Sequence, residues 1–172
     1  MPELAVTVVG QDRPGIIART AELLAGLGMN LEDSSMTLLR GHFAMTLICA
    51  GEADVTTVEQ ALTPLVDGSL EVTVRPVPPA EQVGGGPVQS VLVSVHGADR
   101  LGIVAEMAGV LAEHGGNVID LSTKLVGNLY VLTAEVDLAA PTGVDQLTAA
   151  LTPVAAELGV DVSVEPIVDD EL

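Results

Sequence analysis

Apolar and polar positions follow two different periods along the chain, and the same succession occurs in both halves. Short runs rich in Val predict strands at residues 4–9 and 91–95. Each run is followed by apolar residues at helical spacing, which predict helices that end near Gly28 and Gly115. The positions that carry this spacing include Ile16, Thr20, Leu23 and Leu27 in the first half and Ile103, Met107 and Val110 in the second.

Two β-like segments, a further helix and a closing strand complete the pattern in each half. The segments are 31–39 and 43–50, separated by Arg40-Gly41-His42, and 118–126 and 129–138, separated by a turn at Gly127-Asn128. Helices are predicted over 55–65 and 144–154, and closing strands over 72–77 and 160–167. The order βαββαβ predicts an α+β fold of two ferredoxin-like domains, each an antiparallel sheet with helices on one face.

The two halves are a tandem duplication. Gly15 and Gly102 are 87 residues apart, and many positions between residues 6 and 38 meet the same residue type at this offset. The Pro- and Gly-rich stretch at 78–87 predicts a linker, because its glycines are followed by Pro87 and a strand-like run rather than by a Walker-type Lys-Ser/Thr. We therefore expect domains at residues 1–77 and 88–168, a linker at 78–87 and an acidic tail at 169–172.

Composition narrows the classes of partner. The chain has 172 residues, 48% of them hydrophobic, so it can bury the core of one domain or two small ones. Six basic residues against 24 acidic ones give a formal net charge of −18, which repels nucleic-acid backbones and anionic lipid. Direct nucleic-acid or membrane binding is not expected. Without a signal-peptide pattern or a run of membrane-spanning length, the sequence predicts a cytoplasmic protein.

Side chains suited to catalysis or metal binding are scattered. His42, His96 and His114 stand apart without the spacing of a metal site, and Ser34 and Ser35 lack a nucleophile elbow. We expect no catalytic residues, metal or cofactor. The lone Cys49 lies in an apolar segment and is interpreted as a buried small hydrophobe. One Phe and one Tyr offer no aromatic stacking platform.

The turn between the first strand and the first helix is the chief candidate site, because it occurs twice. Asp12-Arg13-Pro14-Gly15 places a proline in the expected first helical turn and a glycine where the backbone can approach another group. Free N–H groups there suit a carboxylate, to which the arginine could add charge-assisted hydrogen bonds. Asp99-Arg100-Leu101-Gly102 keeps all but the proline. The alternative is that Asp caps the helix and Gly permits tight packing, with no ligand.

An asparagine follows the first helix in each half. Asn30 and Asn117 come after a Gly-containing turn and start the next strand. A side-chain amide can donate to a carboxylate and accept from an ammonium group, so it can serve both halves of an amino acid. The alternative is a turn residue in a left-handed conformation.

At these residues the chain resembles the ACT domain family, and its two copies resemble the tandem ACT proteins of the glycine cleavage repressor type. The resemblance implies a βαββαβ module that binds a small effector, usually an amino acid, where two modules meet side by side. It also implies no catalytic role. The ligand-binding positions carried over by the motif are Asp12, Arg13, Pro14, Gly15, Ile16 and Asn30, and Asp99, Arg100, Leu101, Gly102, Ile103 and Asn117.

The leading hypothesis is therefore an amino-acid-sensing regulator. Binding of a small amino acid would shift the population of arrangements and change association with a protein partner, either a transcription regulator or a metabolic enzyme. A second copy of the chain could also pair through the apolar sheet edges as a homodimer. Two other classes stay open: a ligand-free interaction module, and a small enzyme of the acylphosphatase type, whose phosphate-cradling loop and its arginine have no counterpart here.

Overall fold

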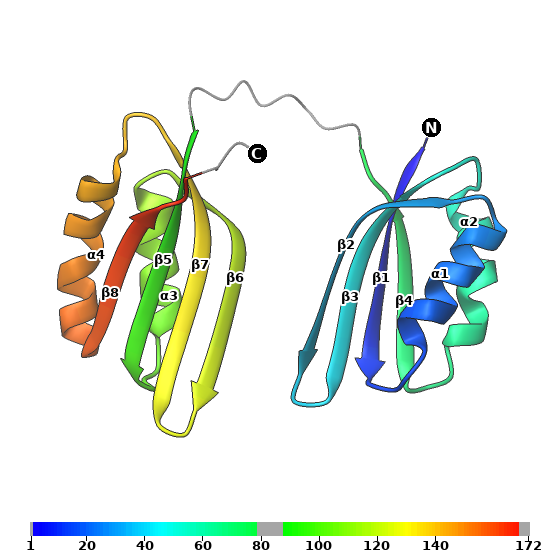
Figure 1. Ribbon diagram of the computed structural model, residues 1–172, viewed down its shortest axis with the longest axis horizontal. Helices are drawn as coiled ribbons and strands as arrows, with labels where there is room; N and C mark the ends of the chain where they lie inside the picture. Colours follow the sequence, from blue (N-terminus) through cyan, green and yellow to red (C-terminus); the bar gives the residue numbers. More distant parts are fainter. Residues whose placement is uncertain (1, 79–87, 169–172) are drawn as a thin grey trace. The chain divides into compact units, whose positions relative to one another are not determined.

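The computed structural model describes residues 2–78 and 88–168 of the chain. Nearly all of the expected linker, residues 79–87, and the expected acidic tail, residues 169–172, lie outside the described residues. The chain divides into two compact units, one on each side of residues 79–87, which are called unit 1 and unit 2 (Figure 1).

Both units have the element order that the duplication predicts. Unit 1 consists of β1 Glu3–Gln11, α1 Ile16–Gly26, β2 Asn30–Leu39, β3 His42–Ala50, α2 Val55–Leu62, a 3-10 turn at Thr63–Leu65, and β4 Leu70–Pro76. Unit 2 consists of β5 Val88–Ala98, α3 Ile103–Glu113, β6 Gly116–Val126, β7 Leu129–Ala139, α4 Val144–Leu158 and β8 Val160–Pro166.

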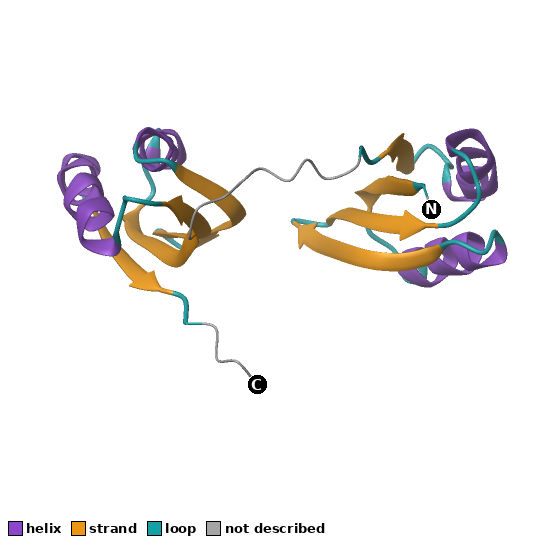
Figure 2. Cartoon of the chain, turned by 90° about the horizontal axis from the view of Figure 1, so that it is seen from above, coloured by secondary structure: helices purple, strands orange, loops and turns teal. Residues whose placement is uncertain are grey.

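Each unit is a four-stranded antiparallel sheet with both helices on one face (Figures 1 and 2). The strand orders are β2-β3-β1-β4 and β6-β7-β5-β8, so the first strand of each unit lies inside its sheet. This is the ferredoxin-like arrangement, and the predicted α+β class with two such domains is confirmed.

The alternation of apolar residues in the central strands produces the core of each unit. In β1 every second side chain, Leu4, Val6 and Val8, is buried against the helices, as a period of two requires. The buried side of α1 is Ile16, Thr20 and Leu24, one residue in four. The Thr20 hydroxyl donates a 2.8 Å hydrogen bond to the carbonyl of Ile16, so it carries no unpaired polar atom into the core.

Cys49 is fully buried in the core of unit 1, as predicted. Its thiol lies 3.6 Å from the carbonyl oxygen of Leu4. Burial raises the pKa of the Cys49 thiol above its ordinary value, which keeps it in the less reactive protonated form.

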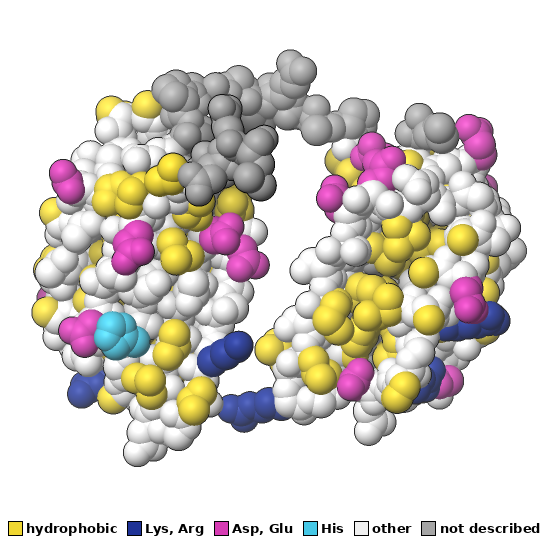
Figure 3. Space-filling model, in the orientation of Figure 1, with side chains coloured by type: hydrophobic (Ala, Val, Ile, Leu, Met, Phe, Trp, Pro, Cys, Tyr) yellow, Lys and Arg dark blue, Asp and Glu magenta, His cyan; other side chains and the backbone are white. Residues whose placement is uncertain are grey.

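The strand at one edge of each sheet is largely exposed. All ten residues of β2 are exposed, including Met36 and Leu38, which are 47% and 52% exposed. In Figure 3, hydrophobic side chains gather over the strands of unit 1. The matching strand β6 exposes Leu121 and Leu125. These edges combine unpaired backbone groups with apolar side chains, which is unusual for a surface left in water.

Two details of the predicted turns are wrong. The β2–β3 connection is the two-residue turn Arg40-Gly41 rather than a three-residue turn. His42 is already the first residue of β3, where it pairs with Gln11 of β1. Pro14 does not lie in the first turn of α1, since the helix begins at Ile16 after Gly15. The backbone determines both boundaries, through the positive φ of Arg40 and Gly41 in the turn and of Gly15 before the helix. The surrounding residue types did not indicate where these conformations would occur.

A small residue is required where β1 passes β4. A Cβ added at Gly10 would lie 2.0 Å from the carbonyl oxygen of Ser69 and 2.8 Å from Cα of Leu70, both of them backbone atoms. We expect Gly10→Ala to lower the free energy of unfolding by about 1–3 kcal/mol. Chemical denaturation measures the effect.

The control is Gly109→Ala in the exposed part of α3, where an added Cβ meets nothing within 4 Å. It should raise the free energy of unfolding by roughly 0.5–1 kcal/mol, because alanine is the better helix former. Equal stability of Gly10→Ala and the unaltered chain would contradict this account of the close approach.

Candidate functional site

The turn between β1 and α1 has an unusual helix start. Gly15 is the N-cap residue and has a left-handed backbone conformation with φ of 91°. No side chain caps the helix, so Asp12 does not act as the cap. The N–H groups of Ile16, Ile17 and Ala18 therefore have no partner within the helix, because the first turn of an α-helix has no preceding carbonyls. Such N–H groups carry the positive end of the helix dipole.

These N–H groups lie at the edge of an open hollow of about 500 Å³, called the unit 1 turn hollow. It brings together five of the six positions predicted in this half, and its sides are largely apolar. The lining residues are Asp12, Arg13, Pro14, Gly15, Ile16, Ile17, Ala18, Met36 and Phe43. An ionic group can therefore meet N–H donors while an apolar side chain rests against the wall.

The Arg13 side chain is engaged away from the N–H groups. Its guanidinium forms an ion pair with Asp67 and donates a 3.0 Å hydrogen bond to the Ser69 hydroxyl. Ser69 also donates to Asp67 through both its hydroxyl and its N–H. Hydrogen bonds from Ser69, followed by the contact with Arg13, hold the pKa of Asp67 well below its ordinary value. Arg13 thus ties the turn to the loop before β4.

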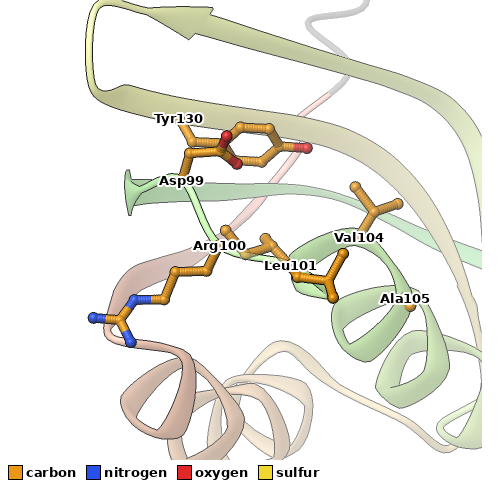
Figure 4. A pocket seen from close by; sticks show the side chains of 8 residues that line it. Asp99, Arg100, Leu101, Val104, Ala105 and Tyr130 are labelled. Carbon is orange, nitrogen blue, oxygen red and sulfur yellow. The ribbon is translucent and has the colours of Figure 1, made fainter.

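Unit 2 has the same turn with one difference. Gly102 is the N-cap of α3, with φ of 96° and no side-chain cap. A hollow of about 520 Å³ lies beside it and again includes five of the six predicted positions. Its lining is Asp99, Arg100, Leu101, Gly102, Ile103, Val104, Ala105 and Tyr130 (Figure 4). Leu101, which replaces Pro14, is completely exposed.

Arg100 also turns away from its hollow. In Figure 4 its guanidinium points away from Leu101, Val104 and Ala105. It lies against Gly159, where an added Cβ would be 3.4 Å from the guanidinium. Gly159 caps the C-terminus of α4 in a left-handed conformation, so the cation sits at the negative end of that helix. Both arginines therefore connect their turn to the loop before the last strand of the unit.

The two asparagines do not join the turn of their own unit. Asn30 pairs with Ala50 at one end of β3, whereas Gln11, next to the turn, pairs with His42 at the other end. The separation is eight residues of strand, or about 26 Å at roughly 3.3 Å per residue. The same separation occurs in unit 2. Asn117 pairs with Asp137 of β7, whereas Ala98, next to the turn, pairs with Leu129 at the other end of that strand. Both asparagines are exposed.

An aromatic residue in each hollow was missed in the sequence. Phe43 and Tyr130 line the two hollows and are the only aromatic residues of the chain. Each faces a glycine across the sheet, Phe43 opposite Gly10 and Tyr130 opposite Gly97. The signal was available, since the two aromatics are separated by the same 87 residues that relate the copies.

Within residues 2–78 and 88–168, no group of three or more His, Cys, Asp or Glu side chains is arranged to hold a metal ion. No helix of that part is both long and apolar enough to cross a membrane.

Comparisons with known proteins place both halves in one family. The family model described as ACT domain matches residues 3–74 and 89–165. The Escherichia coli protein described as glycine cleavage system transcriptional repressor is 27% identical over 128 residues, 70% of this chain but only 64% of that protein. A UPF0237 protein from Methanopyrus kandleri is 44% identical over 75 residues, 43% of this chain and 83% of that protein.

Nearly the whole chain can be compared with a solved structure. The crystal structure of an unknown protein from Galdieria sulphuraria has a TM-score of 0.81 and 27% identity, and the match covers 97% of this chain and 99% of that one. The succession of two such modules in one chain is therefore shared with that structure.

The contacts of Asp67 predict how its carboxyl titrates. Ser69→Ala removes the hydroxyl donor, so the pKa of Asp67 should rise toward the ordinary value of 3.8, and Arg13→Gln should raise it less. Carbon NMR of the carboxyl group measures both shifts. An unchanged pKa in Ser69→Ala would contradict the geometry.

The sign of the effect on stability follows from the lowered pKa. The stabilisation from ionised Asp67 is complete above pH 3.8 and is lost as the pH falls through the folded-state pKa. The unaltered chain should therefore have a larger free energy of unfolding than Asp67→Asn at neutral pH. This difference should become smaller as the solution is acidified.

Proposed function

The chain belongs to the ACT domain family, and on that premise we propose that it is a non-catalytic regulatory protein that binds a small amino acid. The effector binds between ACT units and changes the association of the chain with a partner protein. The observation that carries the proposal is the uncapped helix start beside an apolar hollow, present in both units.

The effector carboxylate is the group that the turn would bind. The N–H groups of Ile16, Ile17 and Ala18 can donate to it, and the left-handed Gly15 leaves the approach open because no Cβ projects there. Arg13 and Arg100 contact other loops, and in this proposal they position their turns rather than contact the effector. Met36 and Phe43 offer an apolar wall to the effector side chain.

The asparagine would come from a different unit. A turn and an asparagine of one unit are about 26 Å apart, since eight strand residues at roughly 3.3 Å separate them. An amino acid is much shorter than this, so both groups can hold it only if two units pair with their strands antiparallel. The exposed apolar strands β2 and β6 support such a pairing along the sheet edges, either within one chain or between two copies.

The proposed mechanism is a population shift. An effector held by groups of two units stabilises their paired arrangement by the difference in its affinity for the paired and separated states. The partner protein distinguishes those states, and by reciprocity its binding changes the affinity for the effector. The unit 1 turn should bind more tightly, because Pro14 leaves less freedom to be lost on binding than Leu101 does.

The E. coli relative is described as a transcriptional repressor, but the match covers 64% of that protein. We propose a protein partner, a transcription regulator or metabolic enzyme, rather than direct DNA contact, because the net charge of −18 opposes a phosphate backbone. The cytoplasm is the expected compartment.

A second candidate function is a ligand-free interaction module. The apolar side chains on β2 and β6 favour it, since pairing alone would bury them. Effector binding separates the two functions, because the module would bind no amino acid.

The proposal predicts the effect of replacing the side-chain amide of Asn30 with a carboxylate. Titration calorimetry of the full chain against the twenty amino acids should find a ligand, and Asn30→Asp should weaken its binding by about tenfold or more, because a carboxylate replaces a donor beside the effector carboxylate. Gln60→Glu makes the same chemical change at an exposed position of α2 and should leave the affinity unchanged.

Absence of binding by any of the twenty amino acids would contradict the effector and favour the interaction module. Binding that Asn30→Asp leaves unchanged, in a protein with unaltered stability, would contradict the role of the amide.

A further inference from the structure

Unit 1 contains a second hollow at the end of its sheet, separate from the turn hollow. Its volume is about 480 Å³, and it shares no lining residue with the turn hollow. The lining comes from the end of β1, the β2–β3 turn and the loop before β4, namely Gly10, Gln11, Arg40, Gly41, His42, Gly68 and Ser69.

Backbone hydrogen bonds hold these three segments together. The N–H of Gln11 donates to the carbonyl of Ser69 at 2.9 Å, and the N–H of Asp12 donates to the carbonyl of Gly41 at 3.1 Å. Gln11 and His42 are also direct cross-strand partners. The hollow is therefore part of the folded framework and does not depend on the order of a free loop.

The side chains of this hollow suit an anion. Arg40 supplies a guanidinium, His42 an imidazole and Gln11 an amide, all of which can donate hydrogen bonds to oxygen. A guanidinium in particular matches the paired oxygens of carboxylate and phosphate groups.

The duplication provides an internal comparison. At the offset of 87 residues, Gln11, Arg40 and His42 correspond to Ala98, Gly127 and Leu129. Unit 2 thus carries no donor side chain at any of the three positions, although it forms a sheet with the same strand order. The three polar side chains are therefore not required for this sheet to form.

Arg40 occupies a backbone position that disfavours it. Its φ is 51°, in the left-handed region, and the corresponding Gly127 has φ of 62°. A residue other than glycine is disfavoured there, because its Cβ comes too close to the following carbonyl oxygen. Unit 2 uses glycine at this point, so unit 1 retains an arginine against the backbone preference.

The guanidinium of Arg40 is also available. The chain has only six Lys and Arg residues against 24 Asp and Glu, and ion pairs engage Arg13 and Arg19. Within residues 2–78 and 88–168, Arg40 has no ion-pair partner. Asp67, which lies in the loop before β4, is already held by Arg13 and Ser69. In so acidic a chain an unpaired arginine in a hollow leaves a local site for negative charge.

We propose that this hollow binds the oxyanion group, carboxylate or phosphate, of a small metabolite. Arg40 binds the oxygens in its fork, while Gln11 and His42 donate from the neighbouring strands. The site is distinct from the amino-acid site at the turn and does not depend on it. Because the N–H of Asp12 is bonded to Gly41, the occupied hollow adjoins the turn and is placed to influence it.

The test uses the full chain labelled with nitrogen-15. Inorganic phosphate and acetate are titrated separately at constant pH and ionic strength, and the amide signals of unit 1 are followed. Saturable shifts should be confined to residues 10–12, 40–42 and 68–69. Saturation by phosphate alone indicates a phosphate ester as the natural ligand, and saturation by acetate indicates a carboxylate.

Arg40→Gly installs the residue of unit 2. This substitution should weaken binding of the anion by about tenfold or more, because a charge-assisted hydrogen-bonded pair is lost. It should not lower the free energy of unfolding, because glycine suits the positive φ at this position. Arg75→Gln removes an exposed cation of β4 outside the hollow and should leave the shifts unchanged.

Three results would overturn the site. The first is that neither anion produces a saturable shift, and the second is that Arg40→Gly shows the same shifts as the unaltered chain. The third is that Arg75→Gln loses as much affinity for the anion as Arg40→Gly, which would mean that the anion is attracted only as a counterion. None of them bears on the amino-acid site, which calorimetry tests separately.

Discussion

The common direction of β1 and β2 governs where the parts of the candidate site can lie. Both strands run antiparallel to β3, which lies between them, so the turn after β1 and the asparagine that begins β2 are at opposite ends of the sheet. No side-chain rearrangement can bridge the eight strand residues between them. An effector site that uses both groups therefore needs a second unit, and duplication supplies one in the same chain.

Comparison of the copies separates the scaffold from its variable parts. The left-handed glycines at the helix starts and the aromatic opposite a strand glycine recur in both units. Two of the differences lie at the end of the sheet that carries the turn after the first strand, where Pro14 is matched by Leu101 and Arg40 by Gly127. Both units have the same strand order, so neither Pro14 nor Arg40 is required for it.

The sequence predicted what local periodicity determines. Alternation in β1 and one-in-four spacing in α1 located the strands, helices and cores, because burial on one face leaves a repeating signal. It could not predict the start of α1, which depends on the backbone of Gly15, or the partner of Arg13, which lies 54 residues away. The separation of turn and asparagine comes from strand order, which no local pattern contains.

The central claim, an amino acid shared between a turn of one unit and an asparagine of another, is tested most directly by isotope-filtered NMR with a carbon-13-labelled effector. The account predicts contacts from one bound amino acid to amide protons at the start of α1 or α3 and to the side-chain amide of Asn30 or Asn117. Contacts to a turn alone, with none to either asparagine, would contradict it.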